Sequence, residues 1–184
     1  RIDLEPFTLV GATTRLGNIS TPMRDRFGAI FRLDFYQKNE IFKILKRTAS
    51  ILEMNVQDDA LTEIAGRSRG TPRIANRVLK RVRDFAQVKN VKEISVEDAR
   101  SSLDSIGIDE NGLENMDRKI LKNLIVNYNG GPTGGKSLAI SINEDIQTIE
   151  DVYEPYLIKE GFIERTSRGR IATDKAYALF DLKK

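Results

Sequence analysis

Apolar residues recur every three or four positions along much of the first half of this chain, which predicts amphipathic helices. The expected helical stretches lie at about residues 39–52, 58–70, 72–89 and 95–106. Each stretch opens with a residue type that favours the start of a helix, namely Asn39, Asp58, Pro72 and Ser95. Four helices with no strand between them predict a small helical bundle.

The second half begins with a linker-like segment at residues 108–113 and then changes pattern. Three helical stretches and two short strands are expected at residues 113–128, 137–143, 150–160, 162–165 and 170–173. Pro155 predicts a kink or a break about one turn before it, because proline cannot donate a backbone hydrogen bond. Three helices followed by a hairpin form the pattern of a winged helix.

Two further apolar stretches, Phe7–Val10 and Phe31–Phe35, read as short strands near the start of the chain. Arg1–Asp3 leads almost at once into the first of them, with no partner strand before it. We therefore expect the chain to be the C-terminal part of a longer protein. The expected fold class is mostly α with minor β.

Composition narrows the possible chemistry. The 184 residues include no cysteine and no histidine, which excludes disulfides and histidine-based acid–base catalysis and leaves none of the nitrogen or sulfur ligands that zinc prefers. No secretory signal opens the chain, and no apolar run approaches the roughly 20 residues of a membrane helix. A cytoplasmic protein is the simplest expectation. The net charge of +3 is by itself a weak argument for nucleic-acid binding.

Candidate chemistry lies between the two expected strands, where Thr13, Thr14, Arg24 and Arg26 follow the first strand. Hydroxyls at the carboxyl end of a buried strand stand where open α/β sheets bind ligands, and the arginines could reach an anion. On residue types alone, a strand end, a turn and two solvated arginines explain this stretch as well. Two more basic segments follow, Ser68-Arg69-Gly70-Thr71-Pro72-Arg73 and Arg165-Thr166-Ser167-Arg168-Gly169-Arg170.

Together and in this order, these segments resemble the RuvB family of AAA+ ATPases, which drives branch migration of Holliday junctions. Residues 7–28 resemble the sensor-1 and arginine-finger segment, residues 68–73 resemble sensor 2, and residues 165–170 resemble the basic hairpin of the family's winged helix. The resemblance covers nearly the whole chain. It implies the edge of an AAA+ α/β core at residues 1–37, a four-helix AAA+ lid at 38–109 and a C-terminal winged helix at 110–184.

The resemblance also implies roles in phosphoryl transfer, which needs positioning and positive charge more than unusual side chains. Thr14 is the sensor-1 candidate near the γ-phosphate, with its neighbour Thr13 as second choice. Arg26 is the candidate arginine finger, and Arg24 is an alternative that the sequence does not separate from it. AAA+ rings supply this arginine to the nucleotide of the next subunit, so a homo-oligomeric, hexameric ring is implied.

The same resemblance places Tyr36 beside bound ATP or ADP and makes Arg73, at the start of a lid helix, the sensor-2 residue. Mg²⁺ would be held by the upstream half of the family's ATPase domain. For DNA, Arg165 and Arg170 are the expected main contacts and Arg168 an adjunct, largely to backbone phosphates. The basic stripe from Arg73 to Arg81 is a weaker DNA candidate, more suited to the nucleotide and a subunit interface.

One motif is interpreted as a coincidence. Gly130–Ser137, GGPTGGKS, satisfies the P-loop pattern by its letters. A working P-loop follows a buried strand and opens a helix, whereas the segment before this one has helical periodicity. No later strand ends in the acidic residues that would hold magnesium.

The function expected from the resemblance is ATP-driven translocation on duplex DNA at four-way junctions, in recombination, repair and the SOS response. RuvA and RuvC are the implied protein partners. Without the upstream P-loop and Walker B residues, this chain is expected to be inactive alone. A winged-helix transcription regulator is the alternative, but it gives no account of residues 7–28 or of Thr71–Arg73. A self-contained P-loop enzyme using Lys136 is a second alternative.

Overall fold

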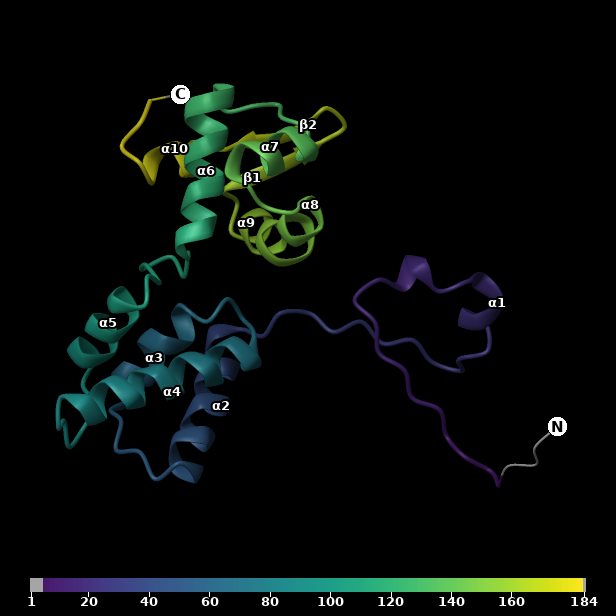
Figure 1. The fold of residues 1–184 in the computed structure, drawn as a ribbon. Coiled ribbons are helices and arrows are strands. Elements are labelled where there is room, and N and C mark those ends of the chain that lie inside the picture. Colours follow the sequence, from purple (N-terminus) through teal and green to yellow (C-terminus); the bar gives the residue numbers. More distant parts are fainter. Residues whose placement is uncertain (1–4, 184) are drawn as a thin grey trace. The chain divides into compact units, whose positions relative to one another are not determined.

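The structure is a computed structural model that describes residues 5–183 (Figure 1). The expectation that rests on Arg1–Asp3 lies outside the described residues. The chain divides into one unit that ends at Asp34 and a second, larger unit from Phe35 onward.

The first unit has little regular structure. Within residues 5–34 it contains a 3-10 helix, η1 (Leu16–Asn18), and one short helix, α1 (Thr21–Arg24), but no strand. The predictions of strands at Phe7–Val10 and Phe31–Phe35 are therefore wrong for this chain. A strand is stable only when neighbouring strands satisfy its backbone groups and cover its apolar side chains. Here neither condition is met, and Leu33 is 93% exposed.

The second unit begins with the predicted helical bundle. Its helices are α2 (Lys38–Ile51), α3 (Asp58–Gly66), α4 (Pro72–Val88) and α5 (Val96–Ser105). Leu45, Leu61 and Leu79, from three different helices, are buried together in one apolar core. Burying each such side chain contributes roughly 1.5–3 kcal/mol, which explains why the apolar spacing predicted the helices correctly.

The helix starts agree with the prediction in part. Ser95 caps α5 as predicted: its Oγ accepts from Asp98 N at 3.2 Å, and Asp98 Oδ2 accepts from Ser95 N at 3.0 Å. For α2 the prediction of Asn39 as N-cap is wrong, because Gln37 takes that position and donates its backbone N–H to Glu40 Oε2 at 2.8 Å. This reciprocal bond satisfies one of the free donors at the helix start.

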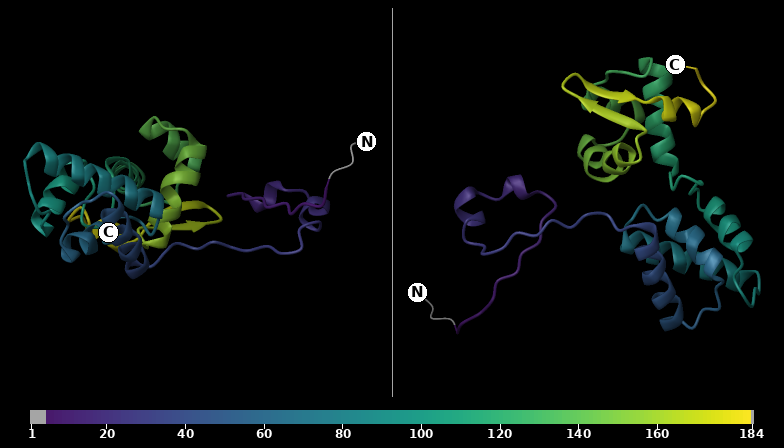
Figure 2. Two further views of the ribbon diagram at one scale, coloured as in Figure 1. Left: turned by 90° about the horizontal axis from the view of Figure 1, so that it is seen from below. Right: turned by 180° about the vertical axis from the view of Figure 1, so that it is seen from behind.

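The rest of the second unit is a winged helix (Figure 2). Its elements are α6 (Asn115–Tyr128), α7 (Gly135–Ile142), α8 (Ile146–Thr148), the π-helix η2 (Ile149–Tyr153), α9 (Glu154–Lys159), β1 (Ile163–Thr166), β2 (Gly169–Ala172) and α10 (Asp174–Ala178). The strands pair antiparallel, with Arg165 opposite Arg170. Leu121, Leu138 and Phe162 lie in a second apolar core under this hairpin.

Pro155 has the predicted effect. The chain passes through the wide turn of η2 immediately before α9, and the proline occupies the first turn of α9. The π-turn accommodates the backbone N–H that Pro155 lacks. The chain therefore continues as a helix on the far side of the proline. Across residues 5–183, no helix has the length and apolar character needed to cross a bilayer.

Candidate functional site

Thr14 and Arg26 both lie in the first unit and are exposed. Thr13, the second-choice hydroxyl, accepts a hydrogen bond from Arg15 N at 3.0 Å, so it is already engaged in a local turn. Arg26 lies two residues after the end of α1 and makes no ion pair with any residue of the described range. Its guanidinium is therefore available to an external anion.

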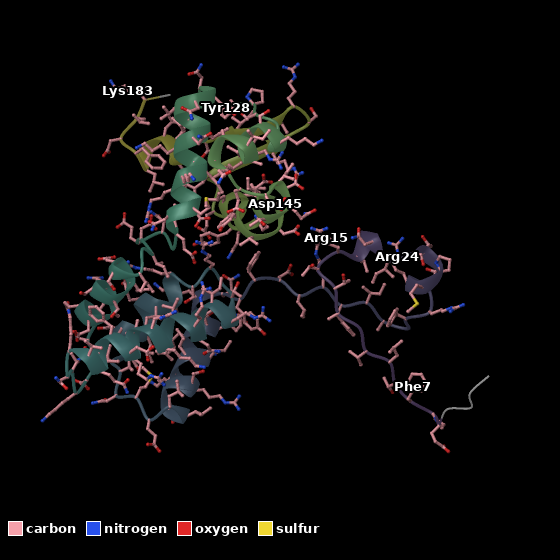
Figure 3. All side chains as sticks on the ribbon, in the orientation of Figure 1. Phe7, Arg15, Arg24, Tyr128, Asp145 and Lys183 are labelled. Atoms are coloured by element: carbon pink, nitrogen blue, oxygen red, sulfur yellow. The ribbon has the colours of Figure 1, made fainter. Side chains whose placement is uncertain are left out.

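Arg24, the alternative finger, is labelled in Figure 3 and differs from Arg26 in its hydrogen bonding. It is half-buried on α1, and its Nη2 donates to Thr21 Oγ1 at 3.0 Å. Its Nε is shielded from solvent and has no partner among the described residues. A side chain folded back on its own helix is less able to reach a neighbouring molecule, so the geometry favours Arg26 over Arg24.

Tyr36 and Arg73 are brought to the same turn of the second unit. The backbone N–H of Tyr36 donates to the carbonyl of Gly70 at 2.9 Å, and the exposed Arg73 follows in the first turn of α4. Gly70 has φ +66°, and a Cβ added to it would lie 2.7 Å from the Tyr36 carbonyl oxygen. Only glycine allows this close approach.

Arg170 is largely buried within the winged helix. Only 6% of it is exposed; its Nε donates to Glu154 at 2.6 Å and its Nη2 donates to Glu150 at 2.6 Å. Burial acts to lower the pKa of Arg170, but the hydrogen bonds to these two carboxylates outweigh it and raise the pKa. In this structure the guanidinium of Arg170 is engaged in an internal ion pair and presents little surface to a phosphate, so its assignment as a main DNA contact stays a prediction.

The other two hairpin arginines remain exposed. Arg165 pairs with Glu150 at 3.1 Å, but 53% of its side chain is accessible. Arg168 lies in the turn between the strands, and its guanidinium makes no ion pair with any residue of the described range. Arg168 was predicted only as an adjunct to the other two, yet it is the hairpin arginine whose guanidinium is most accessible to a DNA phosphate.

The GGPTGGKS loop joins α6 to α7 and packs against β2. Thr133 and Arg170 exchange two backbone hydrogen bonds, at 3.0 and 2.9 Å. A Cβ added to Gly131 would lie 2.2 Å from the Arg170 carbonyl oxygen, and one added to Gly135 would lie 2.4 Å from Arg170 Nη1. The backbone and side chain of Arg170 occupy the space beside Gly131 and Gly135, which supports the interpretation of this motif as a coincidence.

Sequence reasoning missed the acidic partners of the hairpin. Glu150 and Glu154 are four residues apart, a spacing that places both on one helical face toward the arginine-rich strands. That spacing was the available signal. It also missed the joint between the two halves of this unit, where the buried Arg69 pairs with the buried Asp117.

Tyr156 and Asp117 at this joint have altered acidity. Burial raises the pKa of Tyr156 to about 12, so its hydroxyl stays protonated and donates to the Asn111 carbonyl at 2.8 Å. Burial also raises the pKa of Asp117, although the charge of Arg69 opposes this. In residues 5–183 no group of three or more acidic, histidine or cysteine side chains could hold a metal ion.

Comparison with known proteins gives matches along nearly the whole chain. Three family models match in succession: the Holliday junction DNA helicase RuvB P-loop domain at residues 1–33, the RuvB AAA lid domain at 36–109 and the RuvB C-terminal winged helix domain at 110–181. A Holliday junction branch migration complex subunit RuvB from Oleidesulfovibrio alaskensis is 56% identical over 182 residues. Another, from Fusobacterium nucleatum, is 52% identical over 180 residues.

These alignments cover 99% and 98% of this chain but 57% and 54% of the two relatives, so the chain spans little more than half their length. Among solved structures, a mutant of Thermotoga maritima RuvB matches with a TM-score of 0.93 and 49% identity, covering all of this chain and 61% of that one. The structure titled as the Thermotoga maritima RuvB Holliday junction branch migration motor matches with a TM-score of 0.92 and 48% identity, covering 98% of this chain and 61% of that one.

Proposed function

This chain belongs to the RuvB family, and we propose that it supplies the nucleotide-responding and DNA-contacting parts of an ATP-driven motor for Holliday junction branch migration. The observation that carries the proposal is that one unit holds both the exposed Arg73, at the lid turn tied to Tyr36, and the exposed arginines of the hairpin. A nucleotide-dependent movement of that turn would therefore be transmitted to the DNA-binding hairpin through the chain itself and through the side chains packed between them.

In this proposal ATP and Mg²⁺ bind mainly to residues of the family's ATPase domain that this chain does not include. Arg73 and Tyr36 contact the nucleotide of their own subunit. Thr14 positions the attacking water, and Arg26 reaches the γ-phosphate in a neighbouring subunit. Planar guanidinium groups suit both tasks, because they remain charged and donate several hydrogen bonds to phosphate oxygens. By itself the chain is expected not to hydrolyse ATP.

The finger assignment makes the protein an oligomer, and we propose a hexameric ring that encircles duplex DNA in the cytoplasm. RuvA at the four-way junction and RuvC in the resolving complex are the proposed protein partners, in recombination, repair and the SOS response. The division into residues 1–37, 38–109 and 110–184 is retained as the proposed domain organisation.

For DNA contact we propose the hairpin and not the helix before it. Glu150 in η2 and Glu154 at the start of α9 are committed to ion pairs with the hairpin arginines and offer no positive charge to phosphates. Arg168 and Arg165 supply the accessible positive charge. Contacts to phosphates suit a motor that moves DNA of any sequence, because phosphates carry no sequence information.

The decisive experiment uses the full-length protein with a four-way junction and ATP. Arg73→Ala should lower ATP turnover and branch migration together, whereas Lys43→Ala, an exposed cation on α2 outside the basic stripe, should change neither. Equal effects of the two substitutions would contradict the sensor-2 assignment. A junction that the unmodified protein does not migrate with ATP, or a nucleotide found at Lys136, would contradict the motor itself and favour the alternatives of a transcription regulator or a P-loop enzyme.

A further inference from the structure

A buried arginine joins the lid to the winged helix. Arg69 has φ +56°, an uncommon conformation for a residue with a Cβ, and is 7% exposed. Its Nε donates to the carbonyl of Gly112 at 2.9 Å, and its Nη2 pairs with Asp117 in the first turn of α6. Its Cζ also lies 4.8 Å from the centre of the Tyr156 ring. One side chain from the lid thus contacts the linker, α6 and α9.

The acid in this pair is fully enclosed. Asp117 has no exposed surface; its Oδ2 also accepts from Glu114 N at 2.7 Å, while its Oδ1 has no partner among the described residues. Enclosing a charged pair in a protein interior carries a large desolvation cost, so such pairs are weak devices for stability alone. Their best-attested use is to specify one arrangement among several, because any shift leaves a buried charge without its partner.

The surrounding contacts hold the linker from both sides. Arg67 Nη1 donates to the Ile108 carbonyl at 3.2 Å, and Tyr156 Oη donates to the Asn111 carbonyl at 2.8 Å. A Cβ added to Gly112 would lie 2.9 Å from Tyr156 Oη and 3.0 Å from the Arg67 carbonyl oxygen. The linker is therefore packed between the lid turn and α9, with no space for a side chain at Gly112.

A second contact joins α9 to the segment that enters the lid. Lys159 Nζ lies 4.7 Å from the centre of the Phe35 ring, and a Cβ on Gly70 would lie 3.2 Å from the same Nζ. Gly70 is also the residue whose carbonyl accepts from Tyr36 N. The turn that presents Arg73 is thus packed against both its own entry segment and the winged helix.

We propose that Arg69 is a positioning residue that locks the lid to the winged helix, so that a displacement of the sensor-2 turn moves the DNA-binding hairpin with it. This inference rests on the proposed motor function. Arg69 contacts neither nucleotide nor DNA in this account; it acts through Asp117, Gly112 and Tyr156. Without these contacts of Arg69, the lid still responds to ATP, but its movement is no longer fully transmitted to the hairpin.

The first measurement is of rigidity and needs no activity. The chain has no cysteine, so Val88→Cys on α4 and Val126→Cys on α6 give two exposed sites for spin labels in this chain. We expect a narrow distance distribution in the parent and a clearly broader one after Arg69→Ala. The matched control is Arg77→Ala, which removes an exposed ion pair, 3.3 Å long, to Glu114 at the same joint. An equally narrow distribution in both variants would overturn the proposal.

The second measurement is the number of ATP molecules consumed per base pair of branch migration. Arg69→Ala should raise this number by about threefold or more while DNA affinity and maximal ATP turnover stay near those of the parent. ATP turnover and migration that fall in parallel would overturn the proposal. If Arg69→Ala fails to fold, Asp117→Asn keeps the shape of the site and should give the same broadening and uncoupling. Failure of the parent to migrate junctions would instead count against the motor.

Discussion

Arg170 and Glu154 form an ion pair inside the winged helix, with Nε and Oε1 2.6 Å apart and at most 6% of either residue exposed. Glu150 accepts from the other end of the same guanidinium and also from Arg165. The carboxylates of Glu150 and Glu154 therefore hold the two hairpin strands near the turn, while Arg168 in the turn remains free of ion pairs with the described residues. Within one short motif, Arg170 therefore stabilises the fold, while Arg168 is left available for binding.

Arg170→Ala should destabilise the winged helix by about 3 kcal/mol, because it leaves the buried Glu154 with only the longer contact to Arg165, at 3.6 Å. The free energy of unfolding can be measured by urea titration of this chain. Arg168→Ala is the matched control and should change the free energy by no more than about 0.5 kcal/mol, as expected for an exposed residue. Similar stabilities of the two variants would show that the pair is not enclosed in solution.

Arg168→Ala in the full-length protein should weaken binding to duplex DNA at every sequence tested. If Arg168 contacts one phosphate, the slope of log affinity against log salt should become shallower by about 1. Titrations at several salt concentrations measure both effects. Lys122→Ala, an exposed cation on α6, should leave the slope unchanged. An unaltered slope for Arg168→Ala would place the DNA surface elsewhere.

The hairpin illustrates what could be predicted from sequence. The strands and their arginines follow from local apolar alternation and a turn, so Arg165, Arg168 and Arg170 were found. Their different roles depend on which of them faces Glu150 and Glu154 across the fold. That depends on strand register and on the path of the helix after η2, neither of which is visible in residue types.

The first unit shows the opposite case. Phe7–Val10 has the composition of a buried strand, yet Val10 is 85% exposed, because strand formation depends on neighbours that this chain does not provide. The helices α2 to α6 were predictable because each carries its own hydrogen bonds and a periodic apolar face. The joint at Arg69 was not, since its pairing with Asp117 spans 48 positions of sequence.

The cap of α5 should make stability depend on pH. Hydrogen bonds from the Ser95 hydroxyl and backbone N–H lower the pKa of Asp98 below its ordinary value of 3.8. The folded state therefore favours the carboxylate, and this stabilisation is present above that value and lost as the pH falls through the lowered pKa.

Asp98→Ala should accordingly cost about 1 kcal/mol at pH 7, and the difference from the parent should shrink as the pH falls below about 3.8. Urea titrations of this chain at a series of pH values measure it. Asp59→Ala removes an acid from the first turn of α3 that makes no side-chain hydrogen bond with the described residues, so its cost should be smaller. A cost for Asp98→Ala that stays constant down to pH 2 would contradict the cap.

Arg26→Ala in the full-length protein should reduce ATP turnover by about 10³-fold or more while nucleotide affinity stays within a few-fold, because an arginine finger acts on the transition state. Turnover and equilibrium nucleotide binding should be measured side by side. Arg24→Ala is the control, since Arg24 bonds within α1. Mixing Arg26→Ala subunits with subunits defective in their own nucleotide site should restore some turnover if the finger acts between neighbours. Unchanged turnover would contradict the assignment.

Lys136→Ala should leave ATP affinity of the full-length protein within about twofold of the parent, because a working P-loop needs a strand before it and open backbone N–H groups. In this chain α6 precedes the loop, and the side chain and carbonyl of Arg170 occupy the space beside Gly131 and Gly135. Equilibrium binding of a fluorescent ATP analogue is the measurement, with Arg73→Ala compared in parallel. A loss of affinity for Lys136→Ala that exceeds the loss for Arg73→Ala would move the nucleotide to this loop and overturn its interpretation as a coincidence.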